Sequence, residues 1–153
     1  MARIVVLDAG PTGIASNDPA LRSAVRCHAW LAALDAAGAE VLVPAIADYE
    51  VRRELIRAGA TAGVARLDAF RARATFLPLS DAAFRLAAEF WAIVRNLGRP
   101  TAHPHALDGD AILAAQAALC GAPGDNVIIA TTNVGHLARF PGIDARPWDR
   151  IAP

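Results

Sequence analysis

The sequence contains no lysine, and all 15 basic residues of the 153-residue chain are arginines. Fifteen acidic residues balance them, so the formal net charge is zero and no overall positive field attracts nucleic acid. Arginine suits bidentate contacts with phosphate, but we interpret the complete absence of lysine as a coding bias. Any phosphate-binding surface on this chain must therefore be built locally, from a few arginines.

Cysteines are few and long apolar runs are missing. Only Cys27 and Cys120 are present, which excludes a disulfide framework and a cysteine-based metal site. Each lies in an alanine-rich stretch, where we expect a small buried thiol. No apolar run approaches the ~18 residues of a membrane span, and the N-terminal IVVL is too short for a signal peptide. We expect a soluble cytoplasmic protein without a membrane partner.

Apolar residues are abundant, at 55% of the chain, which argues against disorder. A chain of 153 residues has the size of one domain. A chain of this length buries about 70% of the surface that it exposes when unfolded. We therefore expect residues 1–153 to form one domain with its own core.

Short apolar runs alternate with helical patterns along the chain. This alternation predicts an α/β fold, in which a central parallel sheet of four to five strands lies between two layers of helices. The predicted strands are 3–8, 40–44, 75–79 and 126–132, with 144–151 as a candidate edge strand. The predicted helices are 19–37, 45–58, 61–73, 81–97 and 108–120, with a loop at 98–105 and a short helix or turn at 133–139.

Several residues have the character of helix N-caps. Asp18 precedes Pro19, a residue that favours the first helical position, and Ser80 precedes the helix predicted from residue 81. Asp108 opens the apolar stretch DGDAILAAQAAL, and Asp110 would then lie in its first turn. These residues set the helix starts that we predict.

Three acidic residues and one amide lie where a strand ends or a helix begins: Asp8, Glu50, Asp110 and Asn133. Ligands bind at the carboxyl edge of a parallel sheet, so such groups can converge on one divalent cation there. Crowded carboxylates should then have raised pKa values in the metal-free protein. The pattern predicts a metal-dependent phosphodiesterase, because a bound divalent cation activates water and stabilises charge on a phosphate.

Each of these residues also has a purely structural interpretation. Asp8 lies just before GPTG and suits an N-cap or a turn, and Glu50 suits a solvated helix face. Asp108 and Asp110 suit the positive end of a helix dipole, and Asn133 suits a helix cap. The residues themselves leave both interpretations open.

Taken together, the segments resemble the PIN domain, the fold of the VapC-type toxins of bacterial toxin–antitoxin pairs. The resemblance rests on IVVLDAGP with Asp8, on DYEVRREL with Glu50, on DAILAA with Asp110, and on the apolar strand followed by Thr131-Thr132-Asn133. Each motif is weak alone, but the four occur in the family's order across almost the whole chain. The resemblance implies a three-layer α/β/α PIN-like domain.

Two positions depart from the family's pattern. The Ser or Thr often found after the first Asp is replaced by Ala9, with Thr12 as the nearest substitute. The last acidic position is Asn133, a variant that recurs in the family and lowers the charge of the site by one. Asp108 is then a candidate to restore that charge as a further metal ligand.

The resemblance implies a Mg²⁺- or Mn²⁺-dependent endoribonuclease with Asp8, Glu50, Asp110 and Asn133 as catalytic residues. Asp8 and Asp110 would hold the metal, Glu50 would bind a second metal or orient water, and Asn133 would ligate directly or through water. A protein antitoxin and a homodimer are implied by the resemblance alone. The number of metal ions, the RNA target and the antitoxin are not specified by the sequence.

RNA binding by a chain without net charge needs local cations, and Arg52, Arg53 and Arg57 beside Glu50 are the candidates. An alternative is a catalytically weak or inactive PIN-fold protein that binds RNA or forms a complex. A haloacid-dehalogenase-like phosphatase fits poorly, because Gly10 replaces that family's second Asp and the required lysine is absent.

Overall fold

The computed structural model of the chain describes residues 1–98 and 104–153, and only the backbone of residues 104–106. Its centre is a five-stranded sheet in the order β3-β2-β1-β4-β5, with every neighbouring pair parallel. The predicted edge strands β3 and β5 lie at the two margins. The strands are β1 (Arg3–Leu7), β2 (Glu40–Pro44), β3 (Thr75–Leu77), β4 (Asn126–Thr131) and β5 (Ala145–Pro147).

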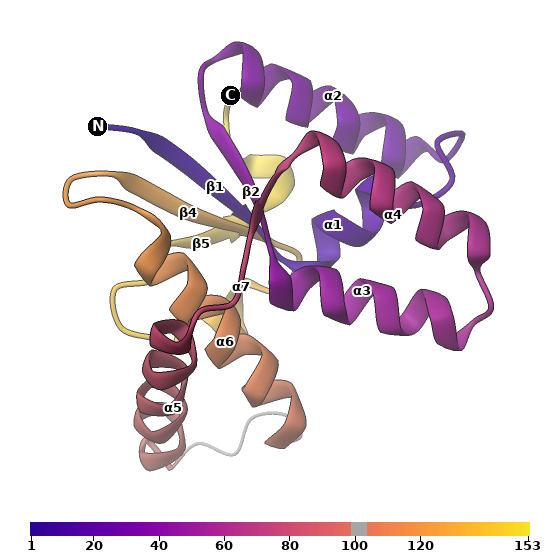
Figure 1. The fold of residues 1–153 in the computed structure, drawn as a ribbon. Helices are drawn as coiled ribbons and strands as arrows, with labels where there is room; N and C mark the ends of the chain where they lie inside the picture. Colours follow the sequence, from indigo (N-terminus) through magenta and orange to yellow (C-terminus); the bar gives the residue numbers. More distant parts are fainter. Residues whose placement is uncertain (99–103) are drawn as a thin grey trace.

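Helices lie on both sides of this sheet (Figure 1). In the described part of the chain, none of them is long and apolar enough to cross a membrane. The helices are α1 (Ala9–Ala15), α2 (Arg22–Ala36), α3 (Ala45–Arg57), α4 (Thr61–Arg73), α5 (Asp81–Asn96), α6 (Pro104–Cys120) and α7 (Val134–Leu137), followed by a short 3-10 helix (Trp148–Arg150).

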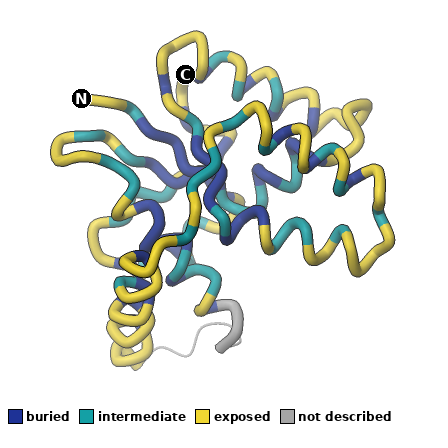
Figure 2. Tube along the Cα trace, viewed as in Figure 1, coloured by how far each residue is buried: buried dark blue, intermediate teal, exposed yellow. Residues whose placement is uncertain are grey.

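Alternating side chains of the central strands supply two separate cores. Ile4 and Val6 of β1 join a cluster with α5 and α6, whereas Val5 and Leu7 join a cluster with α2 and α4. Both faces of β1 are therefore buried, as Figure 2 shows for the centre of the sheet. Burying a side chain such as Leu7 contributes about 1.5–3 kcal/mol. The predicted three-layer α/β/α architecture is confirmed.

At the N-terminal side one helix was missed and one predicted helix start was wrong. Helix α1 was not predicted, because GPTG suggested a turn; Pro11 is tolerated there because it lies in the first turn. Helix α2 begins at Arg22 rather than at residue 19. The Asp18 side chain accepts from Ala20 N at 2.9 Å, so Asp18 organises a turn before the helix instead of capping it.

The start of α6 was also predicted too late. The helix begins at Pro104, so Asp108 is not its N-cap and Asp110 lies beyond the first turn. Residues 99–103 of the predicted loop lie outside the described residues. The prediction at Ser80 is confirmed, since its hydroxyl accepts from Ala83 N at 3.1 Å.

The order of the strands determines where the chain can build a site. Strand β1 leads to β2 on one side, whereas β4 returns to the opposite side of β1, so the connections diverge between β1 and β4. The register pairs Leu7 with Ala130, which brings the ends of these two strands together. In α/β sheets this divergence opens a crevice at the carboxyl ends of the strands.

Candidate functional site

Asp8 lies directly after β1, at the N-cap of α1. Its backbone N–H donates to Ala130 O at 2.9 Å, which fixes it against the end of β4. One carboxylate oxygen accepts from Ala9 N at 2.7 Å, and the other accepts from the Thr131 hydroxyl at 2.6 Å. Asp8 is thus a helix cap, as the structural interpretation expected, but its second oxygen is bound by a different strand.

Thr131 links the ends of β1 and β4 through its hydroxyl. The residue is fully buried, and Oγ1 accepts from Asn133 N at 2.9 Å while it donates to Asp8. Thr12 does not fill this role: it is fully buried, and its hydroxyl has no hydrogen-bond partner among the described residues. The sequence contained the signal for Thr131 in its Thr-Thr-Asn motif, but the prediction gave that threonine no function.

Glu50 lies on α3, and its carboxylate reaches across to α6. Its Oε1 lies directly over Gly109, where any Cβ atom would collide with it. Burial raises the pKa of Glu50 to about 7, with a further rise from Asp8 and Asp110 that Arg53 opposes. Glu50 is therefore not the solvated helix charge of the structural interpretation.

Asp110 lies on α6 with 22% of its side chain exposed. Burial and the charge of Asp8 raise its pKa to about 6, against the opposing charges of His136 and Arg139. Its Oδ2 lies 3.5 Å from His136 Nδ1 and 3.8 Å from Arg139 Nη2. The pKa values of Glu50 and Asp110 are thus raised, as predicted for the metal-free protein, but burial contributes more to both shifts than the charges of the neighbouring acids do.

Asn133 occupies the N-cap position of α7 without acting as a cap. Its side chain makes no capping hydrogen bond. Instead Nδ2 lies 3.1 Å from His136 Nδ1, a contact whose direction depends on the protonation of the ring. The helix-cap interpretation of Asn133 was therefore wrong. No role at the site was predicted for His136, because a single histidine carries no pattern.

Asp108 is not brought to this cluster. It is exposed, and it lines a groove between α5 and α6 with Trp91 and Ile112. It is absent from the charges that shift the pKa of Glu50 or Asp110. Each residue of an α-helix is rotated by about 100° from the one before it. Asp108 and Asp110 are two residues apart, so their side chains leave the helix on nearly opposite sides.

The remaining acids meet only in part. Among the described residues, no three His, Cys, Asp or Glu side chains stand ready to hold one metal ion. Their chemistry nevertheless fits a divalent cation: Asp110 Oδ2 is a buried oxygen that accepts no hydrogen bond from the described residues. Hard cations prefer carboxylate oxygens, and a cation would relieve the repulsion that raises the pKa of Glu50 and Asp110.

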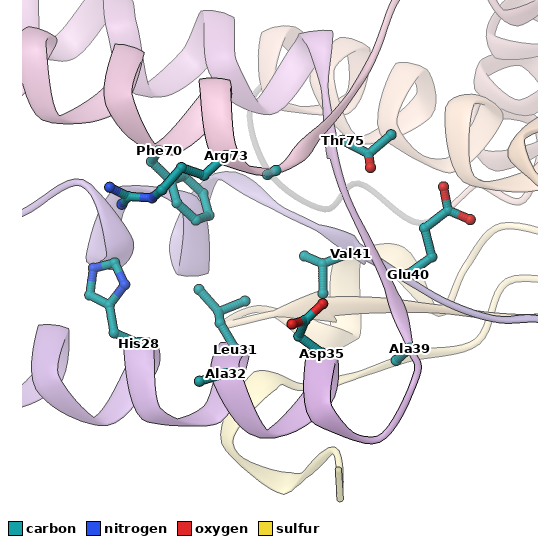
Figure 3. A pocket seen from close by; sticks show the side chains of 11 residues that line it. His28, Leu31, Ala32, Asp35, Ala39, Glu40, Val41, Phe70, Arg73 and Thr75 are labelled. Carbon is teal, nitrogen blue, oxygen red and sulfur yellow. The ribbon is translucent and has the colours of Figure 1, made fainter.

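A separate pocket of about 520 Å³ lies at the opposite end of the sheet, where β2 and β3 begin. Figure 3 shows Arg73 on the same side as His28, with Glu40 on the other side and Leu31 between them. None of the predicted site residues lines it, and His28 Nε2 is occupied by Ala15 O at 2.9 Å. The predicted chemistry therefore belongs to the carboxyl end alone.

Comparison with known proteins gives different results for sequence and structure. No protein-family profile matches the chain, and no curated protein matches it in sequence. Solved structures, in contrast, match over almost the full length, at an identity of 18%. At this identity the likeness establishes the fold and nothing finer.

Three of these structures illustrate the match. The first is VapBC2 from Rickettsia felis, bound to a DNA fragment from the VapBC2 promoter. One of its chains matches with a TM-score of 0.73, covering 95% of this chain and 98% of that one. DNA-bound VapBC from Salmonella typhimurium matches with a TM-score of 0.65, covering 97% of this chain and 99% of that one. FitAcB from Neisseria gonorrhoeae matches with a TM-score of 0.59, covering 96% of this chain and 99% of that one. The chain therefore has the PIN-like fold of the VapC-type proteins.

Proposed function

We propose that this chain is a divalent-metal-dependent endoribonuclease and the toxin of a toxin–antitoxin pair. One observation carries the proposal: Asp8, Glu50 and Asp110 come from three separate elements, yet their charges act on one another at the carboxyl edge of the sheet. Such mutual repulsion is costly in a folded protein, and perturbed acids of this kind gather at functional sites. A structural role gives no reason to bury these acids beside one another.

The chain's own residues divide the work of the proposed site. Asp8 and Asp110 would hold Mg²⁺ or Mn²⁺, and Glu50 would bind a second ion or orient a water molecule. Asn133 would offer its neutral carbonyl oxygen, directly or through water. When bound, the cation would supply charge stabilisation at the phosphate and lower the pKa of water. Thr131 would keep Asp8 in place through its 2.6 Å hydrogen bond.

The partners follow from the same proposal. The structures that the chain resembles are VapBC and FitAB assemblies, some of them bound to DNA. We extend this to the present chain as a proposed protein antitoxin, together with an RNA substrate and a homodimer. A cytoplasmic location stays a prediction.

A second candidate is a weakly active or inactive PIN-fold protein that binds RNA or forms a complex. Two observations favour it: no three acids among the described residues stand ready to hold a metal ion, and an amide occupies the fourth position. The two candidates differ in one measurable property, which is hydrolysis of RNA in the presence of a divalent cation.

Cleavage of single-stranded RNA by the purified chain with Mn²⁺ or Mg²⁺ tests the proposal. We expect cleavage that EDTA abolishes, and a loss of more than about 100-fold in Asp8→Asn, because even residues that only orient metal ligands contribute about 10–100-fold. Asp35→Asn is the control, since Asp35 is an exposed acid at the opposite end of the sheet. Cleavage at the wild-type rate by Asp8→Asn would contradict the proposal.

A further inference from the structure

The three arginines beside Glu50 on α3 have different surroundings. Arg52 donates to Asp48 at 3.0 Å and to Asp68 at 2.8 Å. Arg57 donates to Glu54 at 2.8 Å. Each of these two arginines is thus paired with an acid, and a phosphate would compete with that acid for the guanidinium.

Arg53 is the exception on this helix. It is exposed, and it forms no ion pair with the residues that the structure describes. Its guanidinium carbon lies 5.2 Å from the ring centroid of Tyr49, one turn earlier on α3. Tyr49 is itself 56% exposed, which is unusual for an aromatic side chain. The two residues form an exposed pair, the Tyr49–Arg53 pair.

The pair lies beside the acidic cluster. Arg53 is three residues from Glu50 on the same helix, so the two side chains are neighbours. Its positive charge reaches the Glu50 carboxylate and lowers the pKa that burial raises. A phosphate that approaches Glu50, Asp8 and Asp110 meets negative charge. Arg53 offsets this charge as an exposed cation on α3 that forms no ion pair with the described residues.

The chemistry of the pair matches a nucleotide. An arginine fork binds phosphate oxygens through two parallel hydrogen bonds. An exposed aromatic ring stacks on a base without regard to its identity. A stacked pair at this spacing also stabilises a helix slightly, but helix stability alone gives no reason to place it beside three acids.

We propose that the Tyr49–Arg53 pair holds single-stranded RNA at the acidic cluster, with Arg53 on a backbone phosphate and Tyr49 stacked on the adjoining base. This inference rests on the proposed function and names its substrate-binding residues. Of Arg52, Arg53 and Arg57, the three arginines predicted from the sequence to bind RNA, the inference keeps only Arg53.

Binding of a short fluorescein-labelled single-stranded RNA, measured by fluorescence anisotropy in EDTA, tests the inference without cleavage. For Arg53→Gln we expect weaker binding, and a slope of log affinity against log salt that is shallower by about 0.7, the value for one phosphate contact on a single strand. For Tyr49→Ala we expect at least about a fivefold loss, as for one stacked base. Tyr49→Phe should bind like the wild type, since it keeps the ring.

Arg57→Gln is the matched control, because it removes the same charge one turn farther along α3. We expect it to keep the wild-type salt slope. If Arg53→Gln and Arg57→Gln weakened RNA binding equally, the loss would reflect only the lower positive charge of the protein as a whole. That result would overturn the inference. Wild-type chain that binds no RNA in EDTA, or variants that bind as tightly as wild type, would overturn it too.

RNA binding in EDTA tests the inference, and RNA cleavage with a divalent cation tests the proposed function. If Arg53→Gln binds RNA like the wild type while Mn²⁺-dependent cleavage persists and is lost in Asp8→Asn, the inference fails and the proposed function stands. If the Tyr49–Arg53 pair binds RNA but the wild type cleaves no RNA with any divalent cation, the inference stands and the proposed function fails.

Discussion

The two ends of the parallel sheet carry similar residues in different surroundings. At the amino end, Asp35, Glu40 and Arg73 are exposed around the pocket of Figure 3. At the carboxyl end, Glu50 and Asp110 are largely withdrawn from water and lie near a third acid, and their pKa values rise to about 7 and about 6.

Burial and mutual proximity, rather than the number of charges, distinguish the acids of the carboxyl end from those of the amino end. An exposed acid is solvated and costs little. Burial and the like charge of a neighbouring acid both disfavour the ionised form of a carboxylate, so the pKa of such an acid rises. Matched substitutions at the two ends should therefore have different effects.

The largest effect should come from a divalent cation itself. A ligand that binds only the native state stabilises it by about 2.7 kcal/mol at a hundredfold excess over its Kd. We expect Mn²⁺ to raise the melting temperature of wild type and of Asp35→Asn, and to leave that of Asp8→Asn unmoved. Equal shifts in all three proteins would place the ion somewhere other than the carboxyl end.

The next largest effect should come from Thr131→Val at the carboxyl end of the sheet. The change keeps the shape of a fully buried residue but removes the hydroxyl that binds Asp8 and Asn133 N. We expect Mn²⁺ affinity and RNA cleavage to fall by about 10–100-fold, as for other residues that orient metal ligands. Calorimetric titration and a cleavage assay measure the two quantities.

The same substitution at the other end, Thr75→Val, changes an exposed residue of the amino-end pocket. It should leave both quantities at the wild-type level. Thr131→Ser, which retains the hydroxyl, should restore most of the loss. A Thr131→Ser protein as impaired as Thr131→Val would show that packing, and not the hydrogen bond, is what matters.

The stability of the metal-free protein should depend on pH through Glu50. Its pKa is about 7 in the folded protein against an ordinary 4.5, so this group's contribution to stability is complete below about pH 4.5 and is lost as pH rises through about 7. We expect Glu50→Gln to raise the free energy of unfolding by up to about 2 kcal/mol at about pH 8, after allowance for partial solvent exposure.

At about pH 4 the same variant should match the wild type, because Glu50 is then protonated in both states. Asp110 contributes with the same sign, through its pKa of about 6. Glu40→Gln at the amino end should change stability by less than about 0.5 kcal/mol at either pH. Urea unfolding in EDTA gives all these values, and a wild type that gains stability between these pH values would disprove the assignment.

The smallest effect concerns Asn133. Asn133→Asp should tighten Mn²⁺ binding by about fivefold, near 1 kcal/mol, which is the usual gap between a neutral and a charged contact. Asn133→Ala should weaken it by a similar factor. Because Asn133 makes no capping bond, neither change should lower the free energy of unfolding by the ~1 kcal/mol of a lost cap. Unchanged affinity in both variants would remove Asn133 from the site.

Local signals predicted most of the fold. Apolar runs such as VLV and VIIA gave the strands, and the predicted bounds of α4 match the structure. Helix starts were predicted less well, because capping depends on neighbours outside the element. Asp18 organises a turn, and α6 continues back to Pro104 although Asp108 looks like a cap in sequence.

The site was predictable in its residue types but not in its contacts. Asp8, Glu50 and Asp110 could be chosen because each follows a strand or lies on the next helix. Their partners Thr131 and His136 could not be assigned, since hydroxyl and imidazole groups are common and only spatial neighbours distinguish them. Asp108 was misjudged because direction around a helix depends on where that helix packs.

The sequence by itself determined the order of strands and helices and the acids at their ends, since both are written in local apolar periodicity. The tertiary structure alone decided which acids meet. Placing β4 beside β1 brought the Thr131 hydroxyl to Asp8, and Gly109 without a side chain let Glu50 lie against α6. Packing between distant segments fixes such contacts, because burial and charge interactions act across space and leave no mark on neighbouring residues in the chain.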